Sequence, residues 1–202
     1  MEKEDYENVM LQICSLITES DSEVAAEVQD CLSHTEIYVS EHLEDYNNRD
    51  MHLEDDSLED CQWLGMVDSL INHGYAVEVD WKSSAADFCW NISSLRRFKQ
   101  LGLSLDKKFS GDDSGIEADD FGDYKDDGDE QYSYEREEES FEEQDVPYWC
   151  KYLDNQWFDD DICIGQIDIE NDSYVLFITD PDTLEELEDL ADMLNRRISS
   201  VF

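Results

Sequence analysis

The hydrophobic pattern is most regular over residues 62–98, and its first part predicts an amphipathic helix. Apolar residues recur at helical spacing over residues 63–71. Ser57 and Asp60 stand three positions apart just before this stripe, the spacing of a capping box. Gly74 follows the stripe and supplies the residue that lets a helix end in a left-handed conformation. We therefore predict a helix that begins after Ser57 and ends before Gly74.

The second part of this stretch predicts a strand and another helix. Residues 75–81 alternate between apolar and other side chains, which is typical of a strand with one buried face. The expected core positions are Tyr75, Val77, Val79 and Trp81, opposite Ala76, Glu78 and Asp80. Ser84 and Asp87 form a second capping box. The helix that follows is expected to turn Phe88, Ile92 and Leu95 inward, with the direction of Trp90 left open.

Before residue 57 the pattern predicts helices only. An amphipathic stripe covers residues 4–19. A second stripe extends over residues 23–46, and residues 33–35 are a plausible break between two helices or an interruption within one. The polar stretch 47–56 is expected to be a loop.

After residue 147 the pattern predicts strands and one further helix. Residues 148–157 are aromatic and fit either a helical turn or a strand. Residues 162–169 fit a strand whose apolar phase shifts midway, so we expect a bulge at Gly165 and Gln166. Residues 174–178 are apolar on both faces and predict a central strand. Asp180 and Pro181 begin the last helix as N-cap and first residue, and residues 198–202 are expected to close the sheet.

These elements predict an α+β fold, with N-terminal helices packed on a small mixed sheet. From residue 75 onward the order is β-α-β-β-α-β, which matches a ferredoxin-like arrangement. Residues 106–147 interrupt this order with 9 apolar residues in 42 and no leucine, so we expect a disordered or loosely docked acidic insertion. The chain is thus expected to be one domain, built from residues 1–105 and 148–202.

The charge of the chain excludes several classes of partner. The formal net charge is −42, and residues 111–145 alone carry seventeen acidic and two basic residues. Such a charge argues against binding to nucleic-acid phosphates or to an anionic membrane surface. It permits a basic protein partner, divalent ions, or a role as a solubilising coat.

The sequence places the protein in the cytoplasm. It begins without a basic and apolar secretory signal, and it contains no apolar run long enough to span a membrane. The six cysteines show no metal-binding spacing and are expected to be reduced, mostly buried thiols. The oligomeric state is left open.

Motifs for catalysis and for cofactors are missing from the sequence. It contains no nucleotide-binding glycine loop, no HExxH and no GxSxG, and residues 123–134 fail the calcium-loop pattern. We therefore expect no cofactor. Asp159, Asp160 and Asp161 are weak candidates for a divalent metal, although three solvated acids at a loop edge are the simpler interpretation.

The candidate binding site lies where the charge of the chain changes sign. Residues 82–108 contain six bases and two acids, and the strand before them ends in carboxylates. The candidate residues are Glu78, Asp80, Trp81, Lys82, Arg96 and Arg97. The acidic insertion could fold back over these bases, but bases that balance nearby acids and end a helix are the simpler interpretation.

Three short patches resemble a known family. They are Trp63-Leu64 with Leu70 and Gly74-Tyr75, then Asp80-Trp81-Lys82, and finally residues 172–177 (DSYVLF). The patches resemble a family of small acidic bacterial proteins classed only as a domain of unknown function. The resemblance implies a bacterial, cytosolic protein and no particular activity, cofactor or catalytic residue.

The expected function is therefore protein binding without catalysis, with a basic protein as partner. One alternative is an immunity or DNA-mimic protein that blocks a toxin nuclease or another nucleic-acid enzyme, with carboxylates of Glu78, Asp80 and the insertion in place of phosphates. A second alternative is an enzyme of unrecognised class centred on Asp80, Lys82 and His73.

Overall fold

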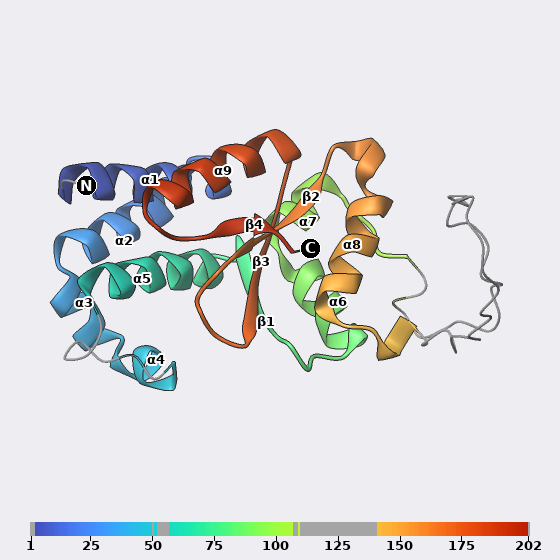
Figure 1. The fold of residues 1–202 in the computed structure, drawn as a ribbon, viewed down its shortest axis with the longest axis horizontal. Coiled ribbons are helices and arrows are strands. Elements are labelled where there is room, and N and C mark those ends of the chain that lie inside the picture. Colours follow the sequence, from blue (N-terminus) through green and yellow to red (C-terminus); the bar gives the residue numbers. More distant parts are fainter. Residues whose placement is uncertain (1–2, 50, 52–56, 107–108, 110–140, 202) are drawn as a thin grey trace, which may run out of the picture.

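The chain forms three layers, with one sheet between two layers of helices (Figure 1). This computed structural model describes residues 3–49, 51, 57–106, 109 and 141–201. The sheet contains β1 (Ala76–Asp80), β2 (Cys163–Ile167), β3 (Ser173–Thr179) and β4 (Ile198–Ser200). The α+β class predicted from the pattern is confirmed.

Helices cover both faces of the sheet. One layer contains α1 (Lys3–Thr18), α2 (Ser22–Ser33), α5 (Leu58–Asn72) and α9 (Pro181–Met193), with α3 (Thr35–Glu41) and α4 (Leu43–Asn48) packed beside α5. The other layer contains α6 (Ala85–Ser94), α7 (Arg96–Leu101) and α8 (Val146–Gln156). Two short 3₁₀ helices, η2 (Phe141–Glu143) and η3 (Phe158–Asp160), flank α8.

The sheet order is β1-β3-β2-β4, and every neighbouring pair is antiparallel. The sheet is therefore antiparallel and not mixed. Both crossovers, from β1 to β2 and from β3 to β4, step over one strand in the same direction along the sheet, while β1 and β3 run in opposite directions. Right-handed crossovers then place their helices on opposite faces. A ferredoxin-like fold carries both crossover helices on one face, so only the order along the chain resembles it.

Each face of the sheet packs against its own hydrophobic core. Phe177, Val175 and Ile167 point toward α1, α2, α5 and α9. Leu176 and Ile164 point toward α6 and α8. Because both faces are covered, the central strands are apolar on both sides, as predicted for residues 174–178.

Local capping chemistry sets the helix boundaries as the sequence predicts. Ser57 and Asp60 form both hydrogen bonds of the capping box that begins α5. At the other end of α5, Gly74 has φ of +74°, and the Tyr75 amide donates to the Leu70 carbonyl, which is a Schellman ending. The Asp180 carboxylate accepts the Thr183 amide at the start of α9. These boundaries are confirmed.

Two expectations around β1 and α6 are wrong, and one question that the sequence left open is answered. Ala76 is fully buried against the α1 side and does not lie on an exposed acidic face. Trp81 comes after the end of β1 and is 50% exposed instead of buried. Trp90, whose direction was left open, is 72% exposed. The reason is that β1 is covered on both faces at its start, where Ala76 and Val77 are both buried, and the alternation does not show where the strand ends.

The bulge predicted at Gly165 and Gln166 is absent. β2 pairs with β3 in unbroken register from Cys163 to Ile167. The apolar phase shifts because Ile164 serves one core and Ile167 the other. Gly165 has a packing role, since a Cβ there would lie 2.3 Å from Cζ of Phe177.

Other ambiguous segments prove to be helical. Residues 23–46 form α2, α3 and α4, with breaks at His34 and His42. Residues 148–157 belong largely to α8. At the predicted insertion, Phe109 is buried and Phe141 is partly buried in the α6–α8 core, so the ends of 106–147 pack on the domain. Residues 110–140 lie outside the described residues.

Asp154 of α8 is a half-buried carboxyl that supports β2. β4 pairs with β2 only over Gly165 to Ile167, and the amide of Ile164, one residue earlier, donates to Oδ1 of Asp154 at 2.8 Å. Burial raises the pKa of Asp154 to about 7, although that hydrogen bond opposes the rise. The folded protein therefore binds this proton more tightly than the unfolded chain does.

We expect Asp154→Asn to stabilise the protein at alkaline pH. An asparagine keeps the acceptor for the Ile164 amide. In the native protein, by contrast, the free energy of unfolding falls as pH rises from the pKa that Asp154 has in the unfolded chain to the pKa that it has in the folded protein. The variant should gain about 2 kcal/mol over the native chain at about pH 8.5, and less at about pH 5.5. Urea unfolding at both pH values measures the difference in free energy of unfolding between the variant and the native chain, with Asp159→Asn, at an exposed position, as control. A difference that does not change with pH would refute the raised pKa of Asp154.

Candidate functional site

Glu78, the first residue of the predicted site, is held in a structural network. Its Oε2 accepts from Nη2 of Arg49 at 2.7 Å, and its Oε1 accepts from the Ser173 hydroxyl. The same Arg49 nitrogen lies 2.8 Å from Oδ1 of Asp68 in α5. The network joins the end of α4 to α5 and to the paired strands β1 and β3, so the Glu78 carboxylate already has a counter-ion, which it shares with Asp68.

Asp80, Trp81 and Lys82 form an exposed turn after β1. The Lys82 amide donates to Oδ1 of Asp80 at 2.7 Å, which is a local turn interaction. Lys82 Nζ lies 4.6 Å from the centre of the Trp81 ring, a cation–π contact. All three residues are exposed. The charged groups of Asp80 and Lys82 therefore both make contacts within the turn itself.

Arg96 and Arg97 tie α7 to other elements of the domain. Arg96 lies 3.2 Å from the Asp21 carboxylate and donates to the Tyr75 hydroxyl. That hydroxyl donates to Asp21 and, with the Glu23 amide, lowers the pKa of the carboxyl. Arg97 lies 2.8 Å from Glu19 and 3.4 Å from Asp180. The two arginines thus have partners at the start of α2 and of α9, which favours charge balance over a binding patch.

The residues of the enzymatic alternative are held by separate contacts. His73 at the end of α5 lies 3.0 Å from the Glu27 carboxylate of α2, whereas Asp80 and Lys82 form the turn described above. The part of the chain that the structure describes joins these three side chains by no hydrogen bond or ion pair. Burial raises the pKa of the Cys14 thiol to about 11 and that of Cys31 to about 12, so both stay protonated and weakly nucleophilic.

The weak metal candidates lie on the exposed surface beside α8. Asp159 and Asp160 belong to η3, and Asp161 follows it with φ of +58°. Among the described residues, no three His, Cys, Asp or Glu side chains are grouped closely enough to hold a metal. Within the same residues, no helix has the length and apolar character to cross a bilayer.

A dense row of acids lies on α9. This 13-residue helix contains six acidic residues and no base. Five are exposed and one is half-buried, and none forms an ion pair within the described part of the chain. They are Asp182, Glu185, Glu186, Glu188, Asp189 and Asp192. We call this row the α9 acidic face.

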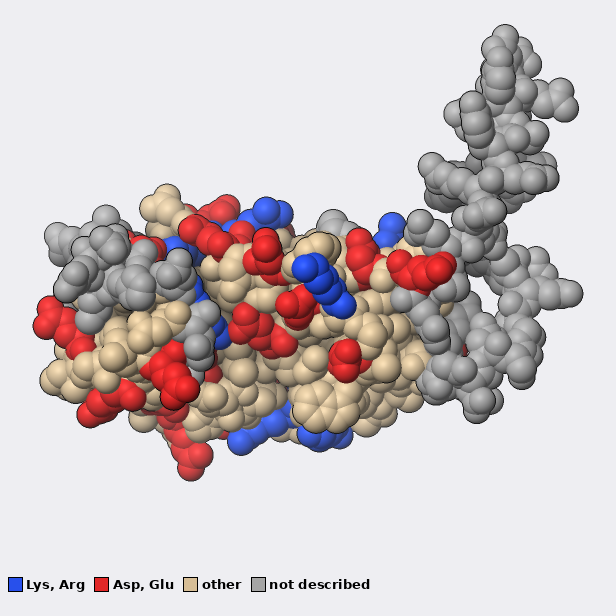
Figure 2. All heavy atoms as spheres, turned by 90° about the horizontal axis from the view of Figure 1, so that it is seen from below, with Lys and Arg blue, Asp and Glu red and all other residues tan. Residues whose placement is uncertain are grey.

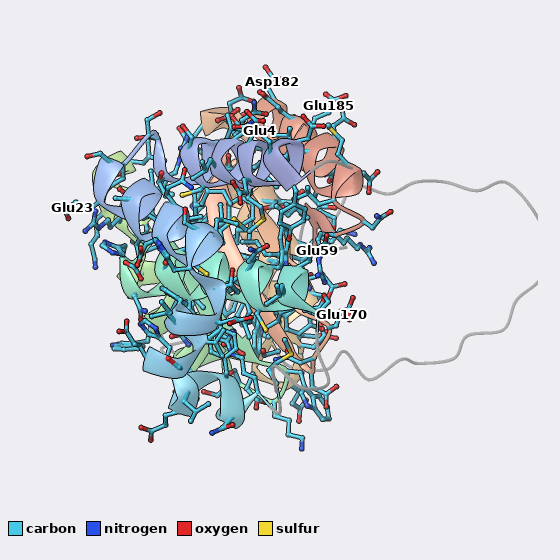
Figure 3. The ribbon with its side chains drawn as sticks, turned by 90° about the vertical axis from the view of Figure 1, so that its left-hand side faces the viewer. Glu4, Glu23, Glu59, Glu170, Asp182 and Glu185 are labelled. Atoms are coloured by element: carbon cyan, nitrogen blue, oxygen red, sulfur yellow. The ribbon has the colours of Figure 1, made fainter. Side chains whose placement is uncertain are left out.

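Figure 3 shows where the α9 acidic face lies. Asp182 and Glu185 point outward at the upper edge of the molecule, above the helical layer, and Glu4 of the neighbouring α1 lies at the same edge. Glu59 of α5 lies lower on the side where α9 packs. The face seen in Figure 2 is different, because lysine and arginine side chains lie among its acids and broad areas carry no charge.

Sequence reasoning passed over α9 because its charges agree with the rest of the chain. The signal was present, since each pair of leucines in residues 181–193 is separated by acids. The sequence does not show, however, that other acids of the domain have partners. The structure shows that Glu78, Asp21 and Asp180 pair with arginines, whereas the α9 acids form no ion pair with any residue the structure describes.

Comparison with known proteins identifies a family but no activity. Residues 9–202 match a domain of unknown function, DUF6630. No curated protein and no solved structure matches the chain. The site must therefore be interpreted from its own geometry.

Proposed function

The chain belongs to the DUF6630 family, and we propose that it is a non-enzymatic module that binds a basic protein through the α9 acidic face. The observation that supports this proposal is the row of six acids on α9, none of which forms an ion pair with another described residue. By contrast, Glu78, Asp21 and Asp180 pair with arginines of the fold, so their charge is less available to a partner. We place the protein in the cytoplasm, in keeping with its free cysteines.

The α9 acidic face lowers the stability of the isolated protein. Acids three or four positions apart on a helix repel each other by a few tenths of a kcal/mol per pair. Asp182 faces Glu185 and Glu186 at this spacing, and Asp189 faces Glu185 and Asp192. A basic partner would relieve this repulsion on binding. Surfaces that lower stability in this way are typical of functional sites.

Charge of one sign also shapes the kinetics of binding. A concentrated acidic row steers a basic partner toward itself and accelerates association, and the effect falls as salt rises. A nuclease or another nucleic-acid enzyme would be one such partner. In that case mimicry of phosphates would rest on α9, because Glu78 is already bonded to Arg49 and Ser173.

We expect neutralisation of α9 to weaken binding of a basic probe without loss of fold. The variant carries Glu185→Gln, Glu186→Gln and Asp189→Asn, and the probe is a labelled oligolysine peptide measured by fluorescence anisotropy. At low salt the affinity should fall about tenfold, since each exposed charge pair contributes a few tenths of a kcal/mol to one kcal/mol. The melting temperature should stay equal or rise, because repulsion is removed.

The matched control removes the same amount of charge elsewhere. Glu44→Gln, Glu170→Gln and Asp172→Asn neutralise three exposed acids outside α9. This variant should bind oligolysine nearly as tightly as the native chain. Equal loss in the two variants would mean that only net charge matters, and the α9 acidic face would then have no special role.

A further inference from the structure

A groove opens at the C-terminal end of α9, where the acidic row ends. It has a volume of about 670 Å³ and lies between α2, α3, the start of α5 and the end of α9. Three of its lining side chains are apolar and largely exposed: Ile37 is 58% exposed, Leu58 48% and Met193 57%. Apolar side chains that gather at one concave site are typical of interaction surfaces.

The walls of the groove are tied together by hydrogen bonds. The Tyr6 hydroxyl donates to the Glu59 carbonyl at 3.1 Å, which joins α1 to the start of α5. Gln62 is buried, and its Nε2 donates to the Thr35 hydroxyl at 2.8 Å and to the Leu32 carbonyl at 3.3 Å. Because four helices are fixed in this way, the groove exists before any ligand arrives, which lowers the entropic cost of binding.

The electrostatic character of the groove is negative. Glu36 and Glu59 line it, and the described residues around it include no lysine or arginine. His34 and Leu194, the C-caps of α2 and α9, also line it. A helix C-terminus carries about half a negative charge. Asp192 of the α9 acidic face directly precedes Met193, a lining residue, in the chain.

We propose that this groove receives the apolar side chains of a basic amphipathic helix in the partner protein, whose lysines and arginines lie along the α9 acidic face. This inference rests on the proposed function, since it specifies the kind of basic partner. Charge complementarity selects the occupant: a neutral apolar segment would leave the surrounding carboxylates without partners, and a fully polar cation would leave the three apolar side chains in water. A segment that is both basic and apolar satisfies both.

The dimensions of the two features agree with such a ligand. α9 has 13 residues and is therefore about 20 Å long, which matches about four turns of a bound helix. The groove is within the size range of sites that bury side chains or small ligands. Apolar side chains of the bound helix that insert into the groove would fix its position and direction, whereas the α9 acidic face alone would only attract it.

Two probe peptides separate the anchor from the charge. The first is a helical peptide of leucine and lysine with its leucines on one face, and the second has alanine in place of each leucine. Both carry the same charge and both favour helix. We expect the leucine peptide to bind the native full-length chain about tenfold more tightly, because its leucines leave water in the groove.

Variants of the groove test its identity. The double variant Ile37→Gln and Met193→Gln should abolish the tenfold difference between the peptides, while its affinity for the alanine peptide stays unchanged. Phe158→Gln removes a side chain that is 78% exposed on η3, away from the residues that line the groove, and should preserve the difference. In methyl NMR spectra the Met193 signal should shift on binding, and those of the buried Met10 and Met66 should not.

The outcomes are distinguishable. If the leucine peptide keeps its advantage in the double variant, or if the Met193 signal does not move, the groove is not the anchor site. The proposed function would still stand in that case, because the alanine peptide binds. If neither peptide binds the native chain at low salt, the proposed function and this inference are both wrong.

Discussion

Replacement of Gly165 by alanine is expected to destabilise the protein by about 3 kcal/mol, because no space exists for a side chain. The Cβ of an alanine would lie 2.3 Å from Cζ and 2.7 Å from Cε1 of Phe177. Phe177 is fully buried and stands between Gly165 on β2 and Ala76 on β1. The ring fits because both cross-strand neighbours are small. Urea unfolding at neutral pH measures the loss.

Two further variants make this prediction specific. Gly102 has φ of +65° and open space around it, so Gly102→Ala should cost only about 1 kcal/mol, through backbone strain. Combining Gly165→Ala with Phe177→Leu should cost less than the sum of the two single changes, since the clash disappears. Strict additivity would show that Phe177 is not what excludes the side chain.

Replacement of Arg49 by methionine is expected to cost about 3 kcal/mol, because it removes the cation that two partly buried carboxylates share. The side chains of Arg49 and Asp68 are only 17% and 16% exposed, and Glu78 shares the same nitrogen. Arg49 Nη1 is buried and has no hydrogen-bond partner within the described residues. The contribution of Arg49 is therefore mainly its ion pairs with the two acids.

A second substitution distinguishes this explanation from a loss of packing. If charge is responsible, adding Glu78→Gln to Arg49→Met should recover part of the lost free energy of unfolding, because one of the two carboxylates is then removed. A double variant that is no more stable than Arg49→Met would contradict the network described for these residues.

Elements governed by neighbouring residues could be predicted from the sequence. Ser57 and Asp60 begin α5, Gly74 ends it, and Asp180 begins α9. Each case depends on hydrogen bonds within a few positions along the chain. The pattern contains that information directly.

Features that depend on distant contacts could not be predicted. The phase shift at Gly165 predicts a bulge as long as only one face of the sheet is taken to be covered, but both faces are covered. Arg96 and Arg97 look like a basic patch until their partners, 75 and 78 residues away, are in view. The groove depends on Ile37, Leu58 and Met193, which only the tertiary structure brings together. Spacing in the sequence carries no signal for any of these.

The described surface divides into acids that stabilise the fold and acids that do not. Glu19, Asp21, Asp60, Asp68, Glu78 and Asp180 pair with arginines and join helices to one another and to the sheet. The α9 acidic face has no such structural role. The α9 acidic face lies beside a preformed groove with apolar side chains, and the two features together favour a partner that is both basic and apolar.

An amide NMR titration of the full-length chain with oligolysine tests the proposed binding face most directly. We predict that the largest shifts occur in the amides of α9, around Glu185 and Asp189, while the Asp80–Lys82 turn changes little. Shifts spread evenly over all exposed acids, or concentrated at that turn, would contradict the proposal.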